Sequence, residues 1–117
     1  MRSLRTPETR ARYDAYKASG GLAEGCILCD RTDTLKEFTH WRILQNLFPY
    51  DLIASVHDML VTKRHVPDTE LSEEELAELR EIKQSYVQDT YEFIIEPMTK
   101  IRSIPTHAHY HLLVPKQ

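Results

Sequence analysis

Apolar and polar positions follow two different periods along the chain, and the longest regular stretch predicts a helix over residues 72–96. Ser72 followed by Glu75 has the spacing of a helix-capping box, and the acidic residues 73–75 favour the positive end of the helix dipole. Pro97 then marks the end of this helix. Apolar residues recur at spacings of three and four, at Leu76, Leu79, Ile82, Tyr86, Val87, Tyr91 and Ile94. A helix with such a stripe needs a packing partner, and we expect that partner to be a sheet.

Three other stretches predict strands. Residues 38–46 (FTHWRILQN) are rich in β-forming side chains, and residues 57–63 form a second run of the same kind. Residues 107–114 alternate strictly, with histidines on one face and apolar residues on the other. Strands before and after one long helix predict an α+β fold with a mainly antiparallel sheet.

Residues 1–24 differ from the rest and predict a helical arm in front of a domain that spans residues 25–117. Pro7 can occupy the first turn of a helix in the arm, and Gly20 and Gly21 would end it. This stretch carries several arginines and no apolar segment, so we do not expect it to be a secretory signal.

Composition excludes several classes of protein. A chain of 117 residues, 41% hydrophobic and 28% charged, is typical of one globular domain. Fifteen Lys and Arg against 18 Asp and Glu give a net charge of −3, so we expect no nucleic-acid partner. No apolar run is long enough for a membrane span, and we expect a cytoplasmic protein. The three glycines all precede Cys26, which excludes Walker-A and dinucleotide-binding loops.

Histidine is concentrated near the C-terminus, where three of the six histidines fall within residues 107–111. On a strand, residues two apart lie roughly 6.6–7 Å apart on one face, so the three rings can serve one small anionic ligand. Three interpretations are open: solvated surface histidines, ligands of a catalytic metal, or a nucleophile whose neighbours hold a phosphate. The closest upstream carboxylate is Glu96, which disfavours a site of two histidines and one carboxylate.

Residues 107–113 (HAHYHLL) resemble the signature of the histidine triad (HIT) family, in which three histidines alternate with apolar residues. Residues 57–66 resemble the family's earlier strand segment, which carries two histidines at the same spacing. Residues 46–50 are similar to its Asn-x-Tyr-Pro-Tyr run, and a Cys-x-x-Cys pair begins at Cys26, as in many members. These four motifs occur in the family's order over residues 25–117, so the resemblance implies a HIT-like fold.

The resemblance implies a nucleotide hydrolase or nucleotidyltransferase that acts on the α-phosphorus of nucleoside phosphoramidates or dinucleoside polyphosphates. His109 would attack and form a nucleotidyl-histidine, which requires its other ring nitrogen to donate to a fixed acceptor such as a backbone carbonyl. His111 would hold the non-bridging oxygens, and His57 would assist from the neighbouring strand. Asn46 resembles the position that holds the ribose, and Ser103 stands where many members carry a phosphate-contacting Gln. Members commonly dimerise, so we also expect a homodimer.

The chain departs from the family in two places, and two other functions stay open. Residues 98–106 lack the family's glycines before the triad, so Lys100 or Arg102 would have to supply phosphate contacts, or the stretch is a short solvated loop. The segment from 46 to 57 is a few residues longer than in typical members. The alternatives are a non-catalytic nucleotide-binding module and a metalloenzyme with its metal on the three histidines.

Cys26 and Cys29 are the only cysteines, and their spacing fits a disulfide, a redox pair, half of a zinc site or two free thiols. The resemblance implies that His65 and His107 complete a Cys₂His₂ set. Such a set is closed and would hold a structural Zn²⁺. His40 competes for the third ligand position.

Overall fold

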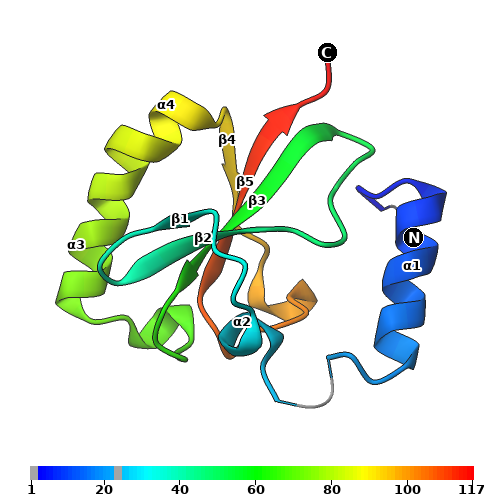
Figure 1. Cartoon of the computed structure of the whole chain (residues 1–117), viewed down its shortest axis with the longest axis horizontal. Coiled ribbons are helices and arrows are strands. Elements are labelled where there is room, and N and C mark those ends of the chain that lie inside the picture. The colour runs from blue at the N-terminus through cyan, green and yellow to red at the C-terminus, as the bar shows by residue number, and fades with distance from the viewer. Residues whose placement is uncertain (1–2, 23–24) are drawn as a thin grey trace.

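The computed structural model describes residues 3–22 and 25–117, and its centre is a five-stranded antiparallel sheet (Figure 1). Residues 1–2 and 23–24 of the predicted arm lie outside the described part. The strands are β1 Lys36–Glu37, β2 Trp41–Gln45, β3 Ala54–Thr62, β4 Phe93–Ile95 and β5 His109–Pro115. They lie in the order β1-β2-β3-β5-β4, with β3 in the centre between β2 and β5. The predicted α+β class with an antiparallel sheet is confirmed.

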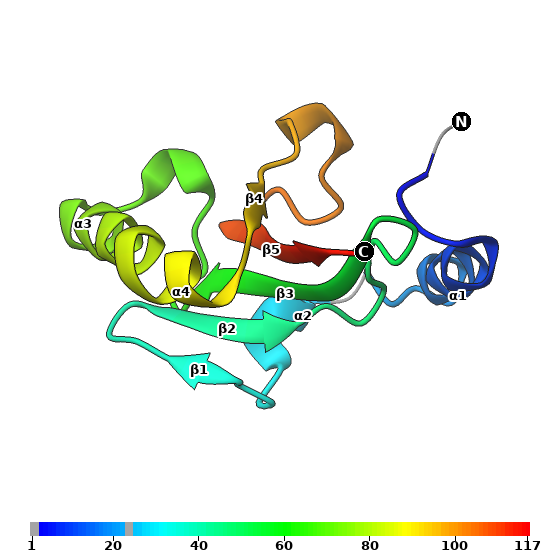
Figure 2. The same ribbon diagram turned by 90° about the horizontal axis from the view of Figure 1, so that it is seen from above.

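Helices flank the sheet at both ends of the molecule. The helices are α1 Pro7–Ala18, α2 Ile27–Asp30, α3 Glu73–Ile82 and α4 Gln88–Thr90, with single 3₁₀ turns at Asp68–Glu70 and Thr99–Ile101. A π-helical turn, Lys83–Val87, joins α3 to α4. Figures 1 and 2 place α1 and α3 on opposite sides of the sheet. None of the helices in the described ranges combines the length and apolar character that crossing a bilayer requires.

The two faces of the sheet carry different clusters of buried residues. The first cluster joins the sheet to α3, the π turn and the residue after α4, and consists of Trp41, Ile43, Leu60, Leu79, Ile82, Val87, Tyr91, Ala108, Tyr110 and Leu112. The second joins the sheet to α2, and consists of Leu28, Leu44, Met59 and Val61. The alternation predicted for β5 is confirmed, because Tyr110 and Leu112 belong to the first cluster while His109 and His111 lie on the other face.

The helix predicted over residues 72–96 is wrong in its last part, because the helix ends at Thr90 and residues 93–95 form β4. Tyr91 already has extended backbone angles, with φ −122° and ψ 167°. β4 pairs in antiparallel register with residues 111–113 of β5. Apolar residues at a three-residue spacing fit a helix, but the same Phe-Ile-Ile run also fits a strand. The backbone hydrogen bonds offered by the open edge of β5 decide between the two.

Three predicted strand bounds also shift. The strand predicted over residues 38–46 contains a hairpin turn, in which Phe38 N donates to Trp41 O at 2.8 Å between β1 and β2. The Glu78 carboxylate of α3 accepts hydrogen bonds from two backbone N–H groups of this turn. These hydrogen bonds stabilise the turn, whereas β-propensity alone predicts an extended backbone there. β3 begins earlier than the predicted start at His57, and β5 begins only at His109, so the first triad histidine precedes the strand.

The predicted capping box at the start of α3 is confirmed. Ser72 Oγ accepts from Glu75 N at 3.1 Å, and the Glu75 carboxylate accepts from Ser72 N at 2.8 Å. Arg64 donates to the same carboxylate at 2.8 Å. This hydrogen bond, helped by those from Ser72, outweighs burial and lowers the pKa of Glu75 to about 2. The carboxylate therefore stays charged and keeps the first turn of α3 capped.

Helix α1 begins at Pro7, as the sequence predicts, and packs on the loop that precedes β3. The Asp51 carboxylate in this loop accepts hydrogen bonds from the backbone N–H of Thr6, at 2.9 Å, and from the Thr9 hydroxyl. These hydrogen bonds outweigh burial and lower the pKa of Asp51. The boundary predicted between arm and domain stays a prediction.

Candidate functional site

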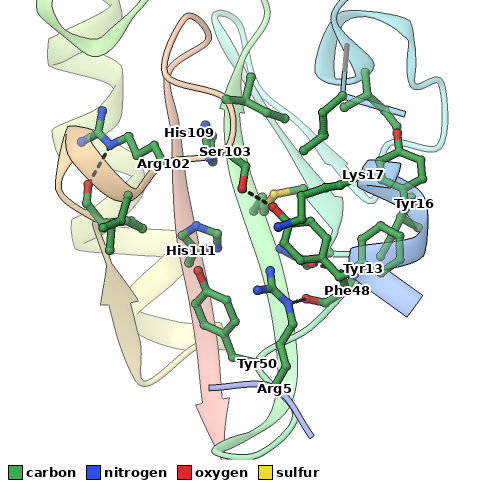
Figure 3. A pocket seen from close by; sticks show the side chains of 18 of the residues that line it. Arg5, Tyr13, Tyr16, Lys17, Phe48, Tyr50, Arg102, Ser103, His109 and His111 are labelled. Carbon is green, nitrogen blue, oxygen red and sulfur yellow. Dashed lines mark hydrogen bonds between the residues drawn. The ribbon is translucent and has the colours of Figure 1, made fainter. Parts of the chain in front are cut away.

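A cavity of about 620 Å³ opens beside β5, on the sheet face opposite α3 (Figure 3). It is lined by the second and third triad histidines, His109 and His111. Its walls come from α1, from the loop between β2 and β3, and from the segment between β4 and β5. The predicted substrate-binding residues Asn46 and Ser103 also line the cavity, whereas His57 lies behind His111. The cavity thus brings together four predicted residues from separate parts of the sequence, and His57 contacts one of them from behind.

The ring of His109 is held by a backbone carbonyl. Its Nδ1 lies 2.7 Å from the carbonyl oxygen of His107, and because a carbonyl only accepts, Nδ1 carries the hydrogen. Nε2 therefore keeps its lone pair. Burial lowers the pKa of His109 and outweighs the opposite effect of the hydrogen bond, so the ring is neutral near pH 7. The acceptor that a nucleophilic His109 requires is present.

His57 and His111 form a hydrogen-bonded pair whose tautomers follow from their surroundings. The backbone N–H of Tyr50 donates to His57 Nδ1 at 2.9 Å, so His57 carries its hydrogen on Nε2. That nitrogen lies 2.7 Å from His111 Nδ1, which must accept. His111 therefore carries its own hydrogen on Nε2, and the chain of three groups makes this nitrogen a donor at the cavity.

The free energy of unfolding is expected to fall as the pH drops below about 6.5. Burial lowers the pKa of His57 and of His111 from 6.5 to about 3, reinforced by the charge of Arg5 at His57 and mainly by the neighbouring His57 at His111. The unfolded chain therefore binds more protons than the folded one at pH values between these limits, and stability present above pH 6.5 is lost toward pH 3. We expect a slope of up to about 1.4 kcal/mol per pH unit for each ring. Urea unfolding at a series of pH values measures it.

The variant His57→Asn measures how much one of the two rings contributes to the pH dependence of the free energy of unfolding. Its slope should be shallower than that of the wild type by about one proton, because one histidine fewer takes up a proton on unfolding. Any acid-induced loss of a metal would affect both proteins alike. Equal slopes in the wild type and His57→Asn would contradict the assigned protonation states.

Asn46 lies at the edge of the cavity with its amide orientation fixed. Its Oδ1 accepts from the backbone N–H of Phe48 at 2.8 Å, so Nδ2 is the atom that lies 3.3 Å from His57 Nε2. Both of these nitrogens carry hydrogen, so neither accepts from the other. The Asn46 N–H groups consequently stay available to a ligand.

The segment before β5 uses several of its polar groups within the protein. The Ser103 hydroxyl is hydrogen-bonded to the Tyr13 hydroxyl of α1. The Arg102 side chain is only 8% exposed, pairs with Asp68 at 3.0 Å, and donates to the carbonyl of Pro97 at 2.7 Å. Its charge is therefore largely balanced before any ligand arrives.

Sequence reasoning missed the contribution of α1 to the cavity. Tyr13 and Tyr16 lie on one face of the helix and pack on Phe48, with ring centroids 5.3 and 5.1 Å apart. Their three-residue spacing is the only local signal of this contact. Arg5, which precedes the helix, also lines the cavity, and no local pattern marks it.

A second cluster of side chains lies beside the cavity and could hold a metal ion. Its members are Cys26, Cys29, His65 and His107, whose ligand atoms all lie within 4.8 Å of one another. His107 Nδ1 lies 3.4 Å from each cysteine sulfur and 3.2 Å from His65 Nδ1. Zinc–ligand bonds of about 2.0–2.3 Å in a tetrahedron place neighbouring ligands about 3.3–3.8 Å apart. Four of the six distances between ligand atoms lie close to this range, so the four side chains could hold a tetrahedral ion.

Hydrogen bonding and burial prepare His107 as a ligand. Its Nε2 donates to the carbonyl of Thr62 at 2.7 Å, so the Nδ1 lone pair faces the cysteines. Burial also lowers the pKa of His107 and keeps it neutral. Burial and the neighbouring thiol raise the pKa of Cys29 to about 11, a shift that a bound cation would reverse. The cluster is linked to the cavity through one hydrogen bond, because the His107 carbonyl holds the ring of His109.

Two alternatives from the sequence lose their support. His40 is not part of the cluster of four, so it does not compete as a ligand. In the described ranges, no group of three or more close ligand side chains contains His109 or His111, which disfavours a catalytic metal on the triad.

A comparison of the chain with protein-family models found no matching model, and a comparison with curated proteins found no matching protein. The resemblance to the histidine triad family therefore rests on the four motifs, and the function has to be inferred from the site itself.

Proposed function

We propose that the chain is a HIT-like nucleotide hydrolase or nucleotidyltransferase that attacks the α-phosphorus of a nucleoside phosphate through His109. One observation carries the proposal: the hydrogen bond from His109 Nδ1 to the His107 carbonyl, at 2.7 Å, leaves a neutral Nε2 with its lone pair on a cavity-lining ring. A solvated surface histidine does not need a fixed tautomer, whereas a nucleophile does.

The neighbouring residues supply what such a reaction requires. A bond forms between His109 Nε2 and phosphorus, and the bond to the leaving group breaks, with its electron pair departing on the leaving group. The His111 Nε2–H donates to a non-bridging oxygen, where negative charge grows, and His57 fixes that donor. The Asn46 amide hydrogens bind a ribose hydroxyl. Water or another acceptor then attacks phosphorus and releases His109.

We also propose that the cluster of Cys26, Cys29, His65 and His107 holds a structural Zn²⁺. Two sulfurs and two imidazoles at tetrahedral spacing match the donor set that zinc prefers, and all four positions are filled by the protein. When bound, zinc would supply no reaction chemistry here; it would fix the position of the residues around His107.

The function is tested by a mass spectrum taken shortly after mixing the protein with an adenosine phosphoramidate or a diadenosine polyphosphate. We expect one acid-labile nucleotidyl group per chain, mapped by peptide analysis to His109. Turnover without any adduct, or an adduct on another residue, would refute the proposed mechanism.

A non-catalytic nucleotide-binding module is the second candidate, favoured by the segment before β5. Its Arg102 is paired with Asp68, and its Ser103 is bound to Tyr13, so both are partly withdrawn from phosphate. Calorimetry that shows nucleotide affinity, together with the absence of adduct and turnover, would select this candidate over the enzyme.

A further inference from the structure

The charged side chains that line the cavity are all of one sign. In the part of the chain that the structure describes, no Asp or Glu lines it. The cationic lining residues are Arg5, Arg10, Lys17, Arg31, Lys100 and Arg102. The chain as a whole has a net charge of −3, so this concentration of positive charge is local. A concave, cationic lining attracts an anionic ligand.

Most of these cations already have a carboxylate partner. The pairs are Arg10–Asp14 at 3.1 Å, Lys17–Asp14 at 3.6 Å, Arg31–Asp33 at 2.6 Å and Arg102–Asp68 at 3.0 Å. Among the described residues, no such partner accompanies Arg5 or Lys100. Lys100 is exposed on a surface turn, whereas Arg5 is half-buried against the cavity. The Arg5 guanidinium is thus the least neutralised charge held in place there.

The position of Arg5 is built by several contacts. Its Nε donates to the carbonyl of Phe48 at 2.7 Å. Its guanidinium carbon lies 4.2 Å from the centre of the Tyr13 ring and 4.9 Å from that of Tyr50. The Tyr50 ring in turn stacks on His111, with centroids 5.1 Å apart. Figure 3 shows the guanidinium between the two tyrosines, on the side of the cavity where His111 lies. Neither Nη group donates a hydrogen bond to any residue that the structure describes, so both can donate to a ligand.

The loop that holds Arg5 is the segment that departs from the family by its extra length. In this loop, Phe48 O accepts a hydrogen bond from Arg5, and the Asp51 carboxylate accepts one from the backbone N–H of Thr6, the N-cap of α1. Leu52 N also donates to Leu4 O at 3.0 Å, directly beside Arg5. The longer loop and the N-terminal segment therefore form one structural unit that places a cation beside His111.

We propose that Arg5 is an anion-binding residue of this cavity, whose two Nη groups bind phosphate oxygens of the ligand. The N-terminal segment then belongs to the substrate site. In the segment before β5, Arg102 is paired with Asp68 and Lys100 is exposed, so Arg5 supplies the cation that is both held in place and without a carboxylate partner among the described residues. The ligand class, a nucleoside phosphate, rests on the proposed function; the binding of phosphate groups by Arg5 does not depend on attack by His109.

Calorimetric titration of the full chain, with its metal content verified, against inorganic pyrophosphate tests this proposal. Pyrophosphate carries no base, so the unknown base preference does not matter. We expect Arg5→Gln to weaken binding about 10-fold or more, because a charge-assisted pair of hydrogen bonds is lost. Arg5→Lys should recover part of the affinity, since it restores charge but not the planar fork.

Arg12→Gln is the matched control. Arg12 lies on α1 and carries the same charge, but it is exposed and does not line the cavity, so its replacement should change affinity by less than about twofold. Thermal unfolding of each variant checks that α1 stays in place. Wild-type affinity in Arg5→Gln, an equal loss in Arg12→Gln, or the absence of pyrophosphate binding by the wild type would each overturn the proposal.

The adduct on His109 is measured separately, so the two proposals can fail independently. An adduct in the wild type together with Arg5-independent pyrophosphate binding overturns the role of Arg5 alone. Arg5-dependent binding without any adduct supports the role of Arg5 and refutes the covalent mechanism.

Discussion

Replacement of His109 by alanine is expected to abolish the nucleotidyl adduct and to lower the turnover rate roughly 10³–10⁶-fold, about 4–8 kcal/mol of activation free energy. The loss is large because no other histidine that lines the cavity has a ring nitrogen with a free lone pair: His109 Nδ1 is bound to the His107 carbonyl and leaves Nε2 free, whereas His111 Nε2 carries a hydrogen. Quenched-flow kinetics with a fluorogenic adenosine phosphoramidate measure the rate.

Two further variants separate the role of His109 from a general loss of structure. His40→Ala removes a histidine outside the cavity and should leave the rate near that of the wild type. His111→Ala removes a donor to the developing charge, so its rate should fall by roughly 10²–10³-fold while some adduct still forms. A His109→Ala protein that keeps the wild-type rate would show that another group attacks phosphorus.

The parts of the fold that follow from local sequence were predicted well. The capping box at Ser72 and the alternation along β5 depend on neighbouring residues only, and both are present in the structure. β4 was missed because its three residues continue the helical spacing of the preceding apolar stripe. What makes them a strand is the open edge of β5, which lies some twenty positions later in the chain.

The features of the cavity also divide into those that local sequence predicts and those that depend on contacts between distant residues. The requirement that a carbonyl hold His109 could be stated from chemistry alone, because a nucleophilic imidazole needs one fixed tautomer. The contribution of the N-terminal segment could not be predicted in this way. Arg5 is hydrogen-bonded to Phe48, and Tyr13 to Ser103, and both pairs are far apart in the sequence. The pattern of apolar and polar residues within positions 1–24 does not indicate which distant loop these side chains contact.

Loss of the proposed Zn²⁺ is expected to produce the largest change in stability. Cys29→Ser or His65→Ala removes one of the four proposed ligands, and the ion would then no longer hold α2 to the sheet. We expect a loss of at least about 3 kcal/mol of unfolding free energy, or roughly 10 °C in Tm. Elemental analysis and calorimetric unfolding, with and without a chelator, measure both quantities.

His40→Ala is again the control, because it removes a histidine that is not a ligand and should keep both the metal and the Tm. Chelation should also slow adduct formation, because the proposed ion would fix His107, and the carbonyl of His107 orients His109. A wild-type protein that binds no metal, or whose Tm is unchanged by the chelator, would show that the four side chains stabilise the fold without an ion. Orientation of the nucleophile would then depend on the hydrogen bond between His107 and Thr62 alone.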